Sequence, residues 1–98
     1  MYAPWVVLHA RRRSDDGRSE SRLGVIASKR VGGAVARNRA RRALREAART
    51  LLREAGGPWD VLLVARPEAL RVGFAERLRV LREMLTKAGV LEESRCPS

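Results

Sequence analysis

Alternating apolar and polar positions predict three β-strands in this 98-residue chain. The strands are expected at Trp5–Ala10, Leu23–Ser28 and Trp59–Ala65. Lys29–Val31 continues the second strand as a short segment, which ends at Gly32-Gly33. The third strand contains an unbroken apolar run, Val61–Ala65, which is typical of a central strand buried on both faces.

A helical period replaces the alternation from about Ala34 to about Glu54. On a helical wheel, six polar side chains fall within an arc roughly 140° wide. They are Arg37, Asn38, Arg41, Arg42, Arg45 and Arg49. The opposite side carries small or apolar residues that suit close packing on a sheet: Ala36, Ala40, Ala43, Leu44, Ala47 and Leu51.

A second helix is expected to begin within Glu68–Phe74 and to end at Ala88. Its apolar stripe has helical spacing: Phe74, Leu78, Leu81 and Leu85. Gly89 suits the C-cap, and residues 90–98 are predicted to form a disordered tail. The order of strand, strand, helix, strand, helix predicts a two-layer α/β sandwich, with a single domain over residues 1–89.

Two polar segments join these elements. Arg11–Arg22 is a charged loop with a turn signal at Asp16-Gly17, and it forms a long hairpin if the strands on either side pair. Ala55–Pro58 ends the first helix with glycine and a following proline. Asp15 and Asp16 resemble a metal pair, but adjacent carboxylates on a loop tip are usually turn and solubility residues, so no protein-bound metal is predicted.

The charge of the chain is strongly positive, with a formal net charge of +10 and an estimated pI of 11.6. The basic arc repeats like charges at i, i+4, which destabilises an isolated helix by a few tenths of a kcal/mol per pair. A solvated surface helix usually mixes signs, so a polyanion is the better explanation for this arc. An anionic membrane is the competing partner, but the helix lacks the large apolar face that interfacial helices bury. No membrane partner is therefore expected.

The sequence offers no catalytic constellation. His9 is the only histidine, and the acidic residues are scattered along the chain. Cys96 is the only cysteine, which excludes an intramolecular disulfide and is typical of a reducing cytosol. The apolar run Trp5–Leu8 is too short for a signal peptide or a membrane span, so we expect a cytoplasmic protein.

The basic helix resembles a known signature. Arg37–Arg45 reads RNRARRALR, similar to the pattern RNxxKRxxR of the protein subunit of bacterial ribonuclease P, with arginine at the lysine position. Ser28–Gly32 (SKRVG) resembles the family's SKKxG, and Asp60–Pro67 (DVLLVARP) resembles its strand ending in ARP. The match runs from about Trp5 to Leu85, and the chain is identified as a member of this family.

The resemblance implies a fold and a function. The fold is an α+β sandwich with a small mixed sheet of about four strands and a C-terminal helix, shared with a domain of one ribosomal protein. The arginine helix lies in a left-handed βαβ crossover, against the usual right-handed rule. Family members bind a large catalytic RNA and with it remove the 5′ leader from precursor tRNA. That RNA supplies the active site with Mg²⁺, so no catalytic residue and no obligate protein partner are expected in this chain.

The resemblance also assigns roles by position. The contacts with the RNA subunit would be Lys29, Arg30, Arg37, Asn38, Arg41, Arg42, Arg45 and Arg49. The candidates for a cleft that holds the leader are Trp5, Val7 and His9, which share one face of the first strand, and Arg66. Which alternate set of the first strand faces the leader stays open.

The N-terminus departs from the family pattern. Family members usually have a helix with aromatic residues before the first strand, and only Met1–Pro4 stands there in this chain. A misassigned start codon, a truncated chain or a real shortening would each explain the difference. A cleft without that helix has lost one wall, so we expect binding of the RNA subunit to survive better than recognition of the leader.

Two other function classes remain. A structural RNA-binding protein of the ribosomal type could use the same basic helix on another RNA, and composition alone does not separate it from the first hypothesis. A self-sufficient nuclease would need an acid–base or metal cluster that the sequence lacks.

Overall fold

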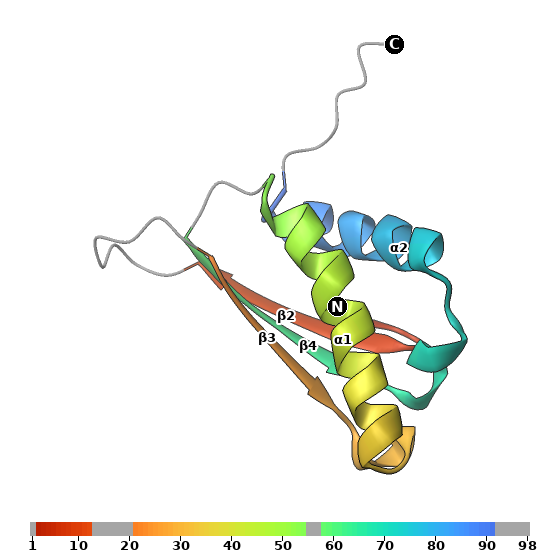
Figure 1. Ribbon diagram of the computed structural model, residues 1–98. Helices are drawn as coiled ribbons and strands as arrows, with labels where there is room; N and C mark the ends of the chain where they lie inside the picture. Colours follow the sequence, from red (N-terminus) through yellow and green to blue (C-terminus); the bar gives the residue numbers. More distant parts are fainter. Residues whose placement is uncertain (1, 13–20, 55–57, 92–98) are drawn as a thin grey trace.

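The computed structural model describes residues 2–12, 21–54 and 58–91. In these ranges a four-stranded mixed sheet is combined with two α-helices and two short 3₁₀ helices (Figure 1). The strands are β1 (Tyr2–Ala3), β2 (Val6–Arg12), β3 (Arg22–Ala27) and β4 (Trp59–Ala65). The helices are η1 (Lys29–Val31), α1 (Ala34–Leu52), η2 (Pro67–Arg71) and α2 (Phe74–Lys87). The predicted strands and helices are confirmed, and the two-residue strand β1 is an addition that pairs antiparallel with β2.

The sheet order is β1-β2-β4-β3, which places β4 between the two other long strands. β4 pairs antiparallel with β2 and parallel with β3, so the prediction of a central strand is confirmed. The hairpin considered for Arg11–Arg22 does not form, because β4 separates β2 from β3; the turn at Asp16-Gly17 lies outside the described residues. The connection from β3 through α1 to β4 is left-handed, as Figure 1 shows with α1 in front of the sheet.

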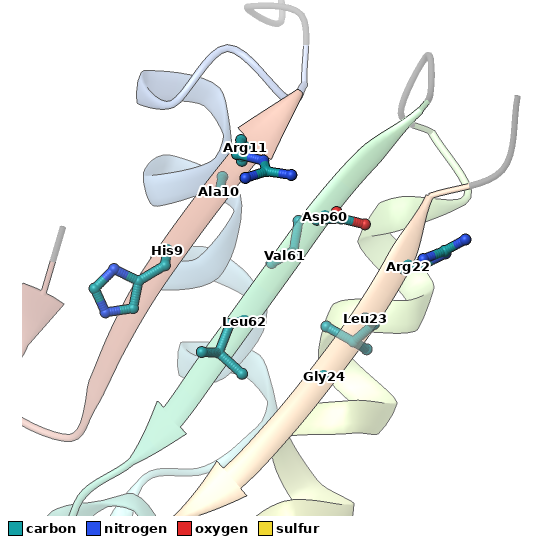
Figure 2. Close-up of a pocket in the computed structure, with 9 residues that line it drawn as sticks. All are labelled: His9, Ala10, Arg11, Arg22, Leu23, Gly24, Asp60, Val61 and Leu62. Atoms are coloured by element: carbon teal, nitrogen blue, oxygen red, sulfur yellow. The ribbon is translucent and has the colours of Figure 1, made fainter. Parts of the chain in front are cut away.

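The core lies between one face of the sheet and the two helices. The largest fully buried side chains are Val6, Leu44, Leu51, Leu63, Leu81 and Leu85, which come from β2, α1, β4 and α2. On β4, burial alternates: Val61 and Leu63 point to the core, whereas Leu62 is 38% exposed and Val64 is half-buried. The predicted burial of this strand on both faces is therefore wrong, because α1 and α2 cover the same face of the described sheet (Figure 2).

The entry to α1 differs from the predicted strand extension. Lys29–Val31 forms the 3₁₀ helix η1, whose first turn is capped by Ser28: its Oγ accepts a hydrogen bond from the Arg30 N–H at 3.2 Å. Gly32 follows with φ 139°, a conformation that L-residues rarely adopt. β3 ends at Ala27, four residues before the predicted extension ends at Val31, because the chain must turn from the sheet onto its helical face.

The C-terminal end of α2 is fixed more firmly than the sequence suggests. The C-cap is Ala88, one residue before the predicted Gly89, and Gly89 follows it with φ 88°, as is typical of the glycine after a helix C-cap. The N–H groups of Val90 and Leu91 then donate to the Leu85 carbonyl at 2.9 and 3.3 Å, and both side chains are buried. The predicted tail is thus wrong for these two residues, because they close the end of the core; residues 92–98, with Cys96, lie outside the described residues.

Candidate nucleic-acid interface

α1 buries a narrow stripe of small and apolar side chains against the sheet and α2. The predicted packing side is confirmed at Ala40, Leu44, Ala47 and Leu51, each 0% exposed, and Ala48 joins them at 1%. The opposite side of the helix is exposed and carries five arginines, which we call the arginine crest. The crest consists of Arg39, Arg42, Arg45, Arg49 and Arg53.

The crest differs from the arc predicted on the helical wheel. Arg37 and Arg41 belong to the predicted arc, but the structure places them on the flank of the helix, where they are half-buried. Arg39 and Arg53 are exposed but lie outside the predicted arc. The signal that could have found them is the position of the apolar stripe, because the exposed side of a helix is centred opposite its buried side.

One arginine of α1 is held by a neighbouring side chain. The guanidinium of Arg41 donates from Nη2 to Oδ1 of Asn38, one helical turn before it. Asn38 is itself exposed. This flank therefore presents an arginine with a hydrogen-bonded partner beside a crest of freely solvated ones.

No arginine of the crest forms an ion pair within the described part of the chain, and Glu46 is the one carboxylate on α1. The ion pairs found there join Arg79 to Glu83 at 3.2 Å and Arg82 to Glu54 at 2.9 Å, and neither uses an arginine of α1. Like charges at i, i+4 then repel along the helix, a cost that a bound polyanion removes. No helix among the described residues is long and apolar enough to cross a membrane.

Two further cations stand at the start of the same helix. Lys29 and Arg30 lie on η1, are exposed, and precede α1 through the Gly32-Gly33 turn. An added Cβ at Gly32 would lie 3.1 Å from Cβ of Ala36, so the turn is packed closely against the first turn of α1. The structure thus places Lys29 and Arg30 at the N-terminal end of the arginine-bearing helix, as predicted.

The sheet face that no described helix covers is the second candidate surface. The strand register aligns its side chains in rows across β2, β4 and β3. A charged row contains Arg11, Asp60 and Arg22; a middle row contains His9, Leu62 and Gly24; an apolar row contains Val7, Val64 and Ile26. Apolar side chains flanked by arginines on an open sheet can accept bases and phosphates of a single strand.

Two hollows lie along this open face. The larger, of about 630 Å³, spans the charged and middle rows, and Figure 2 shows His9, Leu62 and Arg22 around it. The smaller, of about 370 Å³, lies at the other end and is lined by Val7 and by two cations, Arg30 and Arg66. Arg30 thus connects the open face to the basic end of α1.

The structure brings the predicted residues Val7, His9 and Arg66 together on this surface, whereas the predicted exposure of Trp5 on it is wrong. Trp5 is only 4% exposed and belongs to the core. It sits in the turn between β1 and β2, so the strand alternation that holds for Val7 and His9 does not extend to it. Its backbone carbonyl instead accepts a hydrogen bond from the Arg66 N–H at 2.9 Å.

The open face also contains residues that the sequence did not single out. They are Arg11, Arg22, Gly24, Ile26 and Leu62. No local pattern marks them, because their proximity depends on the parallel pairing of β3 with β4.

Comparison with known proteins decides the family. The family model described as Ribonuclease P matches residues 1–89. This chain belongs to the ribonuclease P protein family. A relative named "Ribonuclease P protein component", from Dehalococcoides mccartyi, is 49% identical over 74 residues, which cover 76% of this chain and 60% of that protein.

Solved structures of the family share the fold. The Staphylococcus aureus RNase P protein superimposes with a TM-score of 0.74 at 25% identity, over 94% of this chain and 82% of that one. The RNase P protein from Thermotoga maritima gives a TM-score of 0.72 at 25% identity, over 89% of this chain and 80% of that one. The expected fold class, a small mixed sheet with two helices, is confirmed. The match to the Dehalococcoides relative spans about 60% of that relative's length.

Proposed function

We propose that this chain is the RNA-binding protein subunit of a ribonuclease P ribonucleoprotein, which removes the 5′ leader from precursor tRNA. The observation that carries the proposal is the arginine crest, whose five arginines form no ion pair among the described residues. Membership of the ribonuclease P family indicates that this polyanion is the RNA subunit of ribonuclease P, because relatives in the family are named as protein components of that enzyme.

The catalytic RNA would bind along α1 and the adjoining 3₁₀ helix. Guanidinium groups suit this partner, since each offers several donors to phosphate oxygens in a fixed geometry. The residues assigned to this binding surface are Lys29, Arg30, Arg37, Asn38, Arg41, Arg42, Arg45 and Arg49. A helix surface without base-stacking aromatics favours recognition of backbone shape and charge.

The leader of the precursor tRNA would lie on the open sheet face. Val7 and His9 of β2 provide part of the floor, and Arg66 stands at the end of β4 beside Arg30. An imidazole and aliphatic side chains can contact unpaired bases, while the arginines at both ends of the face contact phosphates.

The chemistry of cleavage would belong to the RNA. Within residues 2–12, 21–54 and 58–91, no group of three or more His, Cys, Asp or Glu is placed to hold a metal ion. As the family resemblance implies, the Mg²⁺ ions that activate water for phosphodiester hydrolysis would be bound by the RNA subunit. The part of the protein is to bind the RNA, to hold the leader and to reduce repulsion between two polyanions.

The test is cleavage of precursor tRNA at low Mg²⁺ by the cognate RNA subunit, first alone and then with the protein added. We expect the protein to stimulate cleavage at the mature 5′ end. Tight RNA binding without stimulation would leave the RNA contact intact and reject the role in leader recognition. Absence of both would reject the proposed function.

The site assignment has its own test in the double variant Arg41→Ala plus Arg45→Ala. Removing two phosphate contacts should weaken binding of the RNA subunit and reduce the slope of log K against log salt by about two charge units. Arg79→Ala is the matched control, because Arg79 is an exposed arginine of α2 that is paired with Glu83. An unchanged slope in the double variant contradicts the assignment.

A further inference from the structure

Asn38 and Arg41 form a side-chain pair that sets one arginine of α1 apart. Nη2 of Arg41 donates to Oδ1 of Asn38. Among the described residues, the five crest arginines make no side-chain hydrogen bond, and their guanidinium groups are exposed. Arg41 is half-buried, which limits the conformations open to its side chain.

The chemistry of the partner matters, because Asn38 is a neutral acceptor. Arg82 on α2 is also held, but by the carboxylate of Glu54, which cancels its charge. The amide of Asn38 takes one N–H of Arg41 and leaves both the positive charge and the remaining donors of the guanidinium free. A guanidinium held in this way is pre-organised for a group with two acceptor oxygens.

We propose that Asn38 is a positioning residue, which orients Arg41 for a two-point hydrogen bond with a phosphate of the bound RNA. The crest arginines act differently: they contribute charge, and their exact donor geometry matters little. The inference rests on the proposed function, because it assumes that α1 binds RNA. It divides the basic surface of α1 into one geometry-dependent contact and a set of charge-dependent contacts.

Substitution of arginine by lysine separates the two kinds of contact, since lysine keeps the charge but loses the planar fork. Arg41→Lys and Asn38→Ala should each weaken binding of the RNA subunit about tenfold, the size of one lost hydrogen bond to a charged group. The salt slope should stay unchanged in both, because no charge is removed. Arg45→Lys, on the crest, keeps its charge and should weaken binding clearly less than Arg41→Lys does. Arg79→Lys, on α2 and outside the proposed interface, is the matched control and should bind as the wild type does.

The double variant Asn38→Ala plus Arg41→Lys gives the decisive measurement. If Asn38 acts through Arg41, the double variant should bind no more weakly than either single variant. Alanine and lysine are both good helix formers, so α1 should keep its circular dichroism signal in all three variants.

Three outcomes overturn the inference. Wild-type binding by Asn38→Ala removes the positioning role, and additive losses in the double variant mean that Asn38 contacts the RNA by itself. A tenfold loss in Arg45→Lys as well means that the crest arginines also depend on geometry. Failure of the proposed function is distinguishable, because the wild-type protein would then neither bind the RNA subunit nor stimulate cleavage.

Discussion

Single residues decide how the arginine-bearing helix is joined to the sheet. Gly32 combines φ 139° with a close approach to Ala36, and Ser28 caps η1 immediately before it. Gly33, the next residue, has φ −72° and open space where a Cβ would stand. Of two adjacent glycines that look alike in the sequence, only the first is required by the backbone.

Gly32→Ala should therefore lower the free energy of unfolding by about 1 to 3 kcal/mol, because alanine is strained at this φ and its Cβ crowds Ala36. Gly33→Ala should cost less, at most about 1 kcal/mol, because the folded conformation accepts a side chain there and only the N-cap preference for glycine over alanine is lost. Urea denaturation of the two variants measures the difference. Equal free energies of unfolding for the two variants would contradict the prediction that alanine is strained in the positive-φ conformation at position 32.

At the scale of elements, α1 is held by a thin apolar stripe and by one polar contact with α2. Both Nη atoms of Arg82 donate to the carboxylate of Glu54 just after α1, at 2.9 and 3.1 Å. This hydrogen bonding holds the pKa of the Glu54 carboxyl below its ordinary value of 4.5. Both side chains are about half exposed, so the contribution to stability is small.

A lowered carboxyl pKa gives this contact a defined pH dependence. Its stabilisation is present at neutral pH, above the unfolded-state pKa of Glu54, and is lost as the pH falls through the lower folded-state pKa. Wild type should thus be slightly more stable than Glu54→Gln at pH 7, and the difference should vanish in acid. Thermal unfolding from pH 7 down to pH 3 measures it. Glu46→Gln is the control, since it removes a carboxylate of α1 that does not contact Arg82; an equal pH effect there would contradict the role of the pair.

On the scale of the whole molecule, two candidate surfaces meet at one end. The basic surface follows α1 and η1, and the open sheet face lies on the side away from the helices (Figures 1 and 2). Arg30 belongs to both, because it lies on η1 and lines the smaller hollow of the open face. One molecule can therefore contact two RNA segments at once, which is what the proposed function requires.

The two surfaces should be separable by mutation. Ile26 is 50% exposed on the open face, so Ile26→Glu should leave the fold intact while adding a charge that repels phosphates. We expect this variant to bind the RNA subunit normally and to lose about tenfold in the preference of the holoenzyme for precursor tRNA over mature tRNA. Binding of both tRNAs to the reconstituted holoenzyme measures the ratio.

Ile26→Val is the conservative control for that experiment and should keep the wild-type ratio. Equal weakening of both tRNAs by Ile26→Glu would mean that the open face does not distinguish the leader. Loss of RNA-subunit binding by Ile26→Glu would show that the open sheet face and the basic surface of α1 are not separate binding surfaces.

The sequence by itself determined the properties that depend on residues close together along the chain. The strand alternation of Val7 and His9, the apolar stripe of α1 and the glycine that ends α2 all follow from local periodicity and backbone preference. The proposed class of partner, a polyanion, also rests on the sequence, because arginines repeated at helical spacing indicate it without any tertiary contact.

Only the tertiary structure decided which side of each element is free. Pairing of β3 with β4 brings together residues almost 40 positions apart, such as Gly24 and Leu62, and no local pattern encodes that contact. Packing of both helices on one face leaves Leu62 exposed, turns Arg39 and Arg53 outward and half-buries Arg41. Periodicity sorts residues onto faces, but the free energy of packing the whole core selects the face that remains in solvent.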